Sequence, residues 1–325
     1  MNTERPLVSI CVPAYNAERW LAEALESALQ QTYSEFELVV ADNASTDATA
    51  ELARGLGDPR IRVETSPQTI SAVANHNRAV HLSRGAFVKF LHADDLLLPE
   101  CVEEMVELAQ EDPRVALVFA PRQVLLEPGS DPEWAERFAR PHERFEHLER
   151  INEGHDLFRQ LLDAGFEENW IGEPSAVLLR RGPLDRVGLF NERVFQIADL
   201  ELWARLAVDY RIGFVDRVLS VYRHHEQSGT AENARTERDW LDTIWLLEGL
   251  LEVPSLAPED RNRLRRLRRA ALRRAFRSQA GRVARGRFST DLPGYLAYRA
   301  HLHGHRARSA ANGREERVEA GTTQT

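Results

Sequence analysis

Two adjacent carboxylates, Asp94 and Asp95, come after a short, mostly apolar run at residues 87–91, with two residues in between. The run has the length of a buried strand, and Pro99 opens a helical pattern just after the acids. Like charges side by side repel unless a cation or several donors hold them, and oxygen ligands suit Mn²⁺ or Mg²⁺. The pair therefore predicts a divalent-metal site. The alternative is that one Asp only caps the helix that follows.

The composition of the chain is that of an ordinary globular protein, with 325 residues of which 43% are apolar. No run of about eighteen apolar residues occurs, and the first residues lack a signal-peptide pattern. We therefore expect a cytoplasmic protein, with contact to the inner face of the membrane as an option. Cys11 and Cys101 are too few for a disulfide framework or a zinc site, and we expect both in the core.

Strand-like and helix-like patterns alternate ahead of the acid pair. We expect strands at 7–12, 36–41, 61–63 and 87–91 and helices at 20–29, 48–56 and 70–82. This alternation predicts an α/β fold with a mostly parallel sheet flanked by helices. The polar loops at Tyr15, Asp42 and Asp94 should then meet at one edge of the sheet, where such folds bind ligands.

This edge has no glycine-rich loop for phosphates. No Gly-x-Gly-x-x-Gly follows the first strand, and no Gly-x-x-x-x-Gly-Lys occurs in the chain. Phosphate charge would have to be met by a metal on the acid pair. Tyr15 offers a ring that can stack on a base, and Asp42 offers an acceptor for a base N–H. Taken singly, Tyr15 also fits a loop aromatic and Asp42 a turn residue.

Five motifs follow one another along the chain: VSICVPAYN at 8–16, FELVVADNASTD at 36–47, NRA at 77–79, Gly85 and FLHADD at 90–95. In their order and spacing, these motifs resemble the family-2 glycosyltransferases of GT-A fold over about the first 225 residues. The resemblance implies a nucleoside-diphospho-sugar donor, most commonly a UDP-sugar, with ribose and metal at the acid pair. The donor contacts that it implies are Pro13, Ala14, Tyr15, Asn16, Asp42, Asn77, His92 and Asp94.

Within these motifs, the chain departs from the family's pattern at two positions. The family usually has Asp-x-Asp where this chain has His92 followed by Ala-Asp-Asp. The division of roles between Asp94 and Asp95 is therefore open, and His92 is either a ribose contact or a filler. His76 stands where an arginine is common.

A second constellation lies at residues 196–206. Leu200, Trp203 and Leu206 form an apolar helical face, and Asp199 falls in the first turn, where the helix dipole favours a carboxylate. The family pattern is Glu-Asp-x-x-Leu-Trp, with Ala198 in place of Glu here, and it implies that Asp199 is the general base. Such a base contributes roughly 10²–10⁴-fold to a rate. The alternative is that Asp199 only caps the helix.

A predicted strand from Val218 ends in Arg223, His224 and His225, which could supply a metal ligand or a donor to the diphosphate. Related enzymes often carry Tyr-Arg-x-His here, which selects His225, although a surface histidine pair is the alternative. The expected metal ligands are Asp94, Asp95 and His225. No second carboxylate is identifiable as a covalent nucleophile, so a single displacement would invert the anomeric centre.

The C-terminal part is strongly basic. Between residues 261 and 308 fifteen arginines face one acid, Asp291, for a net +14; because the whole chain carries −9, the remainder carries −23. An apolar helix at 239–251 should bury against the catalytic domain or a partner, such as the second copy in a homodimer. The Arg-dense helix at 261–284 could lie on anionic lipid, bind nucleic acid or pack on the chain's own acidic body. We favour the chain's own body and expect no nucleic-acid partner.

The sequence thus predicts a GT-A domain at 1–228, a helical Arg-rich extension at 229–305 and a disordered tail at 306–325. The predicted activity is metal-dependent, inverting transfer of a sugar to a hydroxyl of a glycan, a lipid-linked acceptor or a small molecule. The alternatives are a sugar nucleotidyltransferase and a non-catalytic nucleotide-sugar-binding or membrane-adaptor protein.

Overall fold

The structure is a computed structural model that describes residues 5–128, 140–225, 239–283 and 295. The chain forms two compact units, Met1–Ala270 and Ala271–Thr325. The predicted domain boundary at 228 and the predicted tail at 306–325 lie outside the described residues. Among the helices within the described ranges, none is both long and apolar enough to cross a bilayer.

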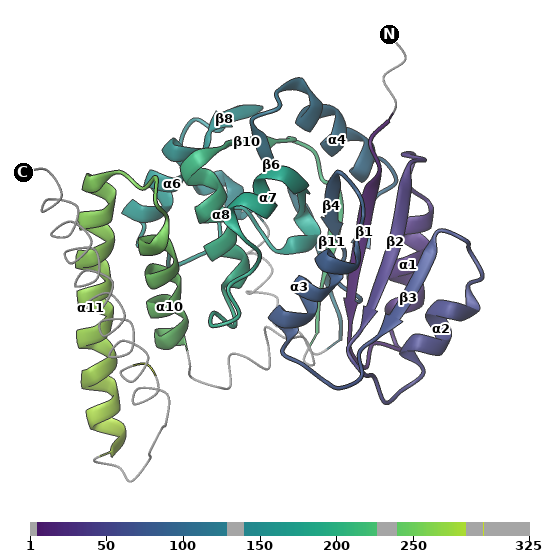
Figure 1. Ribbon diagram of the computed structural model, residues 1–325, viewed down its shortest axis with the longest axis horizontal. Coiled ribbons are helices and arrows are strands. Elements are labelled where there is room, and N and C mark those ends of the chain that lie inside the picture. The colour runs from purple at the N-terminus through teal and green to yellow at the C-terminus, as the bar shows by residue number, and fades with distance from the viewer. Residues whose placement is uncertain (1–4, 129–139, 226–238, 284–294, 296–325) are drawn as a thin grey trace, which may run out of the picture. The chain divides into compact units, whose positions relative to one another are not determined.

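An eight-stranded sheet in the order β3-β2-β1-β4-β9-β6-β10-β8 organises the first unit (Figure 1). Its strands are β1 Val8–Ala14, β2 Phe36–Asp42, β3 Ile61–Thr65, β4 Phe87–Phe90, β6 Val115–Phe119, β8 Ile151–Glu153, β9 Val177–Arg180 and β10 Arg211–Phe214. The first four strands run parallel, as the alternating pattern predicts, and β6 and β10 are also parallel. By contrast, β9 is antiparallel to both β4 and β6, and β8 is antiparallel to β10, so the sheet is mixed.

Helices cover both faces of this sheet. The helices of the described residues are α1 Leu21–Leu29, α2 Thr49–Gly55, α3 Ala72–Leu82, α4 Cys101–Glu111, α6 Gly154–Asp163, α7 Arg181–Val187, α8 Ala198–Asp209, α10 Asp239–Glu252 and α11 Pro258–Val283, with 3₁₀ turns at Pro141–Arg144 and Pro174–Ala176. Strand β1 shows how the faces divide, because alternate side chains point to opposite sides. Ile10 joins the apolar cluster with α1 and α4, whereas the Cys11 thiol contacts the Ala79 carbonyl of α3. Figure 1 shows α3 on the opposite side of β1 and β2 from α1.

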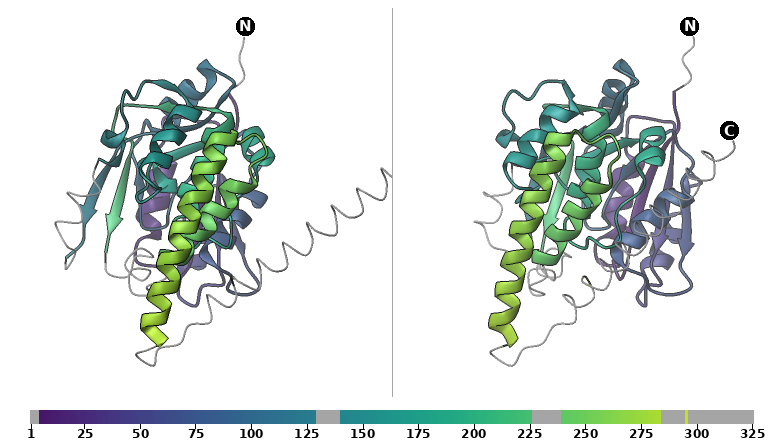
Figure 2. Two further views of the ribbon diagram at one scale, coloured as in Figure 1. Left: turned by 90° about the vertical axis from the view of Figure 1, so that its left-hand side faces the viewer. Right: turned by 60° about the vertical axis from the view of Figure 1, so that its left-hand side comes forward.

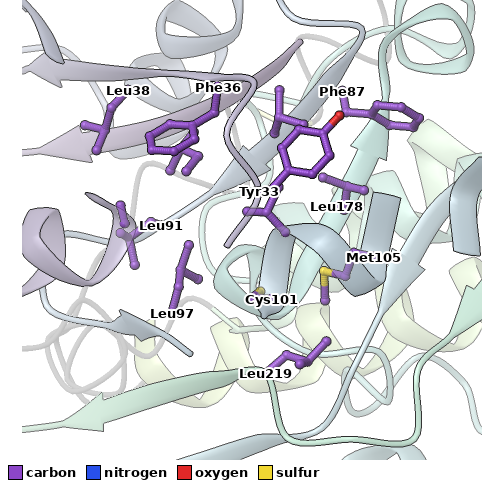
Figure 3. Close-up of a cluster of buried hydrophobic side chains, with 14 of the residues drawn as sticks. Tyr33, Phe36, Leu38, Phe87, Leu91, Leu97, Cys101, Met105, Leu178 and Leu219 are labelled. Carbon is purple, nitrogen blue, oxygen red and sulfur yellow. The ribbon is translucent and has the colours of Figure 1, made fainter. Parts of the chain in front are cut away.

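The apolar cluster under α1 and α4 is the main core. Figure 3 shows part of it, in which Cys101 and Met105 of α4 gather with Tyr33, Leu97 and Leu178 from other elements. Both cysteines of the chain are buried and free, as expected. This core fixes β1 and β4, the two strands whose ends carry the predicted chemistry.

A smaller three-stranded sheet ties the acid pair to a distant part of the chain. Its strands are β5 Leu96–Leu97, β11 Ser220–His224 and β7 Arg122–Leu126, in that order. Strand β5 follows Asp95 directly and pairs antiparallel with β11, and Figure 2 shows β7 and β11 side by side. The sheet therefore brings the end of β11, with His225, beside the acids. The sequence pattern did not predict β5, β7, β8, α7 or β10, which are all short and show no clear period.

The apolar helix α10 packs against α8 within the first unit. Of the two predicted options, burial against the catalytic domain or against a partner, this contact agrees with the first. Gly249 permits the close approach, since a Cβ there would lie 2.2 Å from Glu201 Oε1. The first residues of α11 also contact this unit. Arg261 donates to the Leu251 carbonyl at 2.6 Å, and Arg268 lies 3.2 Å from a Glu248 oxygen. At these two positions the arginines pack on the chain's own body.

Candidate active site

A cavity of about 470 Å³ opens where β1 and β4 end. It brings together seven of the predicted site residues from four separate segments of the chain: Pro13, Tyr15, Asn16, His92, Asp94, Asp199 and His225. A second cavity, of about 570 Å³ beside α7 and α10, contains none of them. We therefore place the chemistry in the first cavity.

Four predicted site residues lie outside the lining of this cavity. Ala14 and Asp42 pair across β1 and β2, and both are buried. Asp42 accepts one hydrogen bond from the Ser45 N–H at 3.2 Å, while its Oδ2 is buried with no hydrogen-bond partner among the described residues. The Asn77 side-chain amide donates to the Phe190 carbonyl and accepts the Phe190 N–H, each at 3.0 Å. Asn77 thus holds a loop that lines the cavity and does not itself face it. Asp95 is the fourth.

The acid pair is divided between two tasks. Asp95 is almost fully buried, and its Oδ1 accepts the Arg223 backbone N–H at 2.9 Å, which joins the acid loop to β11. Its Oδ2 has no hydrogen-bond partner in the described part of the chain. Burial raises the pKa of Asp95, and the neighbouring charge of Asp94 adds to the effect. Asp94 faces the cavity and accepts a hydrogen bond from His225 Nε2 at 3.1 Å.

The burial of Asp94 opposes ionisation, but the hydrogen bond from His225, the nearby histidines and a backbone hydrogen bond together outweigh it and lower the pKa of Asp94. Neither acid caps α4, whose N-cap is Glu100 without a side-chain hydrogen bond. Ligand atoms of His92, Asp94 and Asp95 all lie within 4.8 Å of one another. The chemistry of this donor set, together with the unpaired Asp95 oxygen, fits a divalent cation.

His92 is not a passive filler. Its Nε2 lies 3.0 Å from His76 Nε2, its Nδ1 lies 3.6 Å from Asp95 Oδ2, and its backbone N–H donates to Ser175 Oγ at 3.0 Å. His76 Nδ1 in turn contacts the Ala72 carbonyl at 2.8 Å. Burial lowers the pKa of His76 to about 3 and also lowers that of His92, so both imidazoles are neutral.

Asp199 lies in the first turn of α8 and lines the cavity. The N-cap of α8 is Ile197, so Asp199 is not the helix cap. Asp199 Oδ2 accepts a hydrogen bond from Asn169 Nδ2 at 2.9 Å, and Oδ1 accepts the Leu200 N–H at 2.7 Å. Burial raises the pKa of Asp199 to about 7. A carboxyl group that titrates near neutrality is suited to take and release a proton.

Only His225 of the three residues at the end of β11 lines the cavity. The Arg223 guanidinium is committed to the fold: it bonds Glu127 at 2.7 Å and Glu23 at 2.5 Å, and lies 4.3 Å from the centre of the Trp20 ring. These contacts direct the Arg223 guanidinium toward Glu127, Glu23 and Trp20, and Arg223 is not in the lining of the cavity. The sequence correctly predicted that Arg223 lies near the C-terminal end of this strand, but it did not reveal the acidic partners of Arg223.

Sequence reasoning missed Arg19 and one acidic residue of the lining, Glu173. Its Oε2 lies 2.7 Å from Arg122 Nε, and both side chains are largely buried. The signal that could have found it is an acid between Gly172 and Pro174, directly before a buried strand. Gly172 adopts φ of 114°, a left-handed conformation that glycine readily accepts, so the turn points to a constrained loop.

Comparisons with known proteins agree with this geometry. The model of the family "Glycosyl transferase family 2" matches residues 9–187. "Uncharacterized protein MT1568" of Mycobacterium tuberculosis (strain CDC 1551 / Oshkosh) is 36% identical over 260 residues, which cover 80% of this chain and 80% of that protein.

Two solved structures share the fold. S. aureus TarS 1-349 in complex with UDP superposes with a TM-score of 0.60 at 17% identity, over 89% of this chain and 78% of that one. Mannosyltransferase PcManGT from Pyrobaculum calidifontis, in complex with GDP-Man and Mn²⁺, superposes with a TM-score of 0.55 at 21% identity, over 92% and 81%. The family model covers more than half of the chain, and the mycobacterial relative matches four fifths of it. The chain therefore belongs to glycosyltransferase family 2.

Proposed function

We propose that this glycosyltransferase moves a sugar from a nucleoside diphosphate to an acceptor hydroxyl, with a divalent cation and with inversion. The observation that carries the proposal is that one cavity holds both Asp199, with a pKa of about 7, and the metal-binding group around Asp94. The structural neighbours support the donor class, since TarS was solved with UDP and PcManGT with GDP-Man and Mn²⁺.

The nucleoside end of the donor would lie against the loop after β1. Tyr15 lines the cavity and is 51% exposed, so its ring is available for stacking on a base. Asp42 lies behind this loop, outside the cavity lining, and keeps one buried carboxylate oxygen without a partner among the described residues. A shift of the loop on donor binding would let that oxygen accept a base N–H. UDP is the nucleotide we propose, because uracil presents such an N–H and TarS was solved with UDP; thymine and guanine also present one, and the titration below distinguishes the three.

The diphosphate end would lie at the metal group. Asp94, Asp95 and His225 would hold Mn²⁺ or Mg²⁺, which when bound neutralises the charge that develops on the leaving nucleoside diphosphate. Among the described residues that line the cavity, Arg19 is the one arginine or lysine, and its guanidinium lies 4.0 Å from the centre of the Trp20 ring. The cation held by the acid pair, rather than an arginine cluster, would thus neutralise the phosphate charge.

Asp199 would act as the general base. The acceptor oxygen forms a bond to C1 of the sugar as the C1–O bond to the diphosphate breaks, the electron pair leaves with the diphosphate, and the hydroxyl proton passes to an Asp199 oxygen. Glu173 also lines the cavity, but it is paired with Arg122. We infer that Asp199 does not share the reaction with a covalent nucleophile, which favours inversion over retention. The acceptor would be a hydroxyl of a glycan, a lipid-linked sugar or a small molecule.

Isothermal titration of the purified chain with UDP, dTDP and GDP, each with and without Mn²⁺, tests the donor site. We expect metal-dependent binding of UDP that is lost in the Asp94→Ala/Asp95→Ala double variant. Asp199→Asn should bind UDP like the wild type, yet lose sugar transfer and donor hydrolysis. Absence of binding of all three diphosphates would overturn the proposal. Full turnover by Asp199→Asn would rule out Asp199 as the general base.

A further inference from the structure

A short chain of hydrogen bonds runs from helix α3 into the metal-binding group. The Ala72 carbonyl can only accept, so the His76 Nδ1 at 2.8 Å from it must carry a proton. The His76 ring packs against Phe90 and Phe190, apolar surroundings that disfavour a charged imidazole, so its Nε2 is bare. That nitrogen lies 3.0 Å from His92 Nε2, so His92 must donate its Nε2–H to it. In neutral His92 the lone pair is therefore on Nδ1.

The lone pair of His92 Nδ1 meets another acceptor. Asp95 Oδ2 lies 3.6 Å from it, is buried, and has no hydrogen-bond partner in the described ranges. Two acceptors that face each other beside a buried carboxylate are unfavourable unless a proton or a cation lies between them. One ring nitrogen of His92 and one carboxylate oxygen from each of Asp94 and Asp95 fall within 4.8 Å of one another. A separation of 3.6 Å suits two ligands of one cation, each bonded at roughly 2.1 Å.

We propose that His92 binds the divalent cation through Nδ1, and that His76 positions it by fixing its tautomer. This inference rests on the proposed metal-dependent donor site and adds a ligand to it. The site then offers two imidazoles, those of His92 and His225, beside the carboxylates of Asp94 and Asp95. Imidazole suits first-row transition metals, whereas Mg²⁺ prefers an all-oxygen set. The site should therefore select Mn²⁺ over Mg²⁺.

The surroundings of His76 support a positioning role. Its ring packs against those of Phe90 and Phe190, with centroids 5.4 and 5.6 Å away, so the imidazole is held between β4 and the loop at 190. A ligand histidine whose other nitrogen is hydrogen-bonded keeps its tautomer and ring orientation, and loss of such a partner typically weakens metal binding by about 10–100-fold.

Metal binding to the full-length chain, with Mn²⁺ alone as the probe, tests the ligand. Free Mn²⁺ is followed by its electron paramagnetic resonance signal, and Mg²⁺ is added as a competitor. We expect His92→Ala to weaken Mn²⁺ binding at least about tenfold. His92→Asp, which restores the acid common in the family, should keep Mn²⁺ binding but lower the Mn²⁺-to-Mg²⁺ selectivity about tenfold or more.

Two further variants separate ligation from folding. His76→Phe retains a ring for the aromatic contacts but cannot accept the His92 N–H, so Mn²⁺ binding should weaken at least several-fold. His81→Ala, at an exposed position of the same helix, is the control and should leave Mn²⁺ binding unchanged. Circular dichroism and thermal melting of each variant confirm that the fold is retained.

Pulsed paramagnetic resonance of bound Mn²⁺ gives a direct reading of the ligand. His225→Asn removes the other candidate imidazole, so a ¹⁴N coupling that persists in His225→Asn and disappears in His92→Asp/His225→Asn supports the proposal. Mn²⁺ binding to the wild type with no ¹⁴N coupling in His225→Asn, or equal affinity in His92→Ala, overturns the proposal while leaving the donor site intact. UDP binding by the wild type without any Mn²⁺ binding would overturn both this inference and the metal dependence of the proposed function.

Discussion

Asn169 holds the carboxylate of Asp199 through a hydrogen bond of 2.9 Å from Asn169 Nδ2 to Asp199 Oδ2. The same amide group donates to the Gly172 carbonyl at 2.8 Å, and its oxygen accepts the N–H groups of Ile171 and Gly172. Trp203, on α8 with Asp199, donates its indole N–H to the same Gly172 carbonyl at 2.9 Å. The loop before β9 and the first turn of α8 are thus locked together, and the base is oriented by that lock.

Asn169→Ala should move the pH dependence of transfer to higher pH. The lost bond stabilises the charged form of Asp199, and a hydrogen bond to a charged group is worth about 1.5–3 kcal/mol. The pKa of Asp199 should therefore rise by about one unit or more. The measurement is kcat/KM against pH, with UDP affinity as the control for an intact donor site. An acid limb that does not move would show that Asn169 only supports the turn.

The wild-type enzyme should lose activity as the pH falls through about 7, because burial raises the pKa of Asp199 to about 7 and only its ionised form can take a proton. The fall in kcat/KM should approach tenfold per pH unit below that value. Asp199→Asn is the control, since its residual activity has no such limb. A wild-type profile that stays flat between about pH 5.5 and 8 would contradict the assignment of Asp199 as base.

The sequence predicted those parts of the fold and site that lie within one local pattern. Strands β1, β2 and β4, the polar loops at their ends and the first turn of α8 each follow from a run of neighbouring residues. The antiparallel direction of β9 and the short elements β5, α7 and β10 do not follow from a local pattern, because their placement depends on distant parts of the chain. A period needs several turns or alternations before it can be read.

The contacts that complete the site depend on tertiary packing. His76 meets His92, Arg122 meets Glu173, and Asn169 meets Asp199, each across at least sixteen residues of sequence. No spacing rule predicts such pairs. The same reason explains Arg223: its strand was predicted, but the acids that occupy its guanidinium come from elements far along the chain.

Replacement of Arg205 by Met should destabilise the protein strongly. Arg205 Nε lies 2.9 and 3.0 Å from the carboxylate oxygens of Glu201, and its other nitrogens donate to the carbonyls of residues 187–189. Glu201 is 1% exposed, so it would be left as an uncompensated buried charge at a cost of about 3–5 kcal/mol. Urea unfolding measures the change.

Arg150→Met is the matched control for that prediction. Arg150 also pairs with a glutamate, Glu111, at 2.5 Å, but the two side chains are 57% and 45% exposed. Solvent weakens such a pair to about 0–1 kcal/mol. Equal losses of unfolding free energy in Arg150→Met and Arg205→Met would mean that the Glu201 site is not the rigid, buried contact that the structure describes.

Asp42→Asn should weaken UDP binding without affecting the metal. The unpaired Oδ2 of Asp42 is the proposed acceptor for the base N–H, and the amide would place a donor or a weaker, uncharged acceptor there. Loss of a hydrogen bond to a charged group corresponds to a roughly tenfold or greater rise in the Kd for UDP. Mn²⁺ affinity measured without nucleotide should be unchanged, because Asp42 is outside the metal-binding group. Tyr15→Phe keeps the ring and should bind UDP nearly as well as the wild type, whereas Tyr15→Ala should not. If Asp42→Asn binds UDP as tightly as the wild type, the base does not reach Asp42 and the nucleoside must lie elsewhere in the cavity.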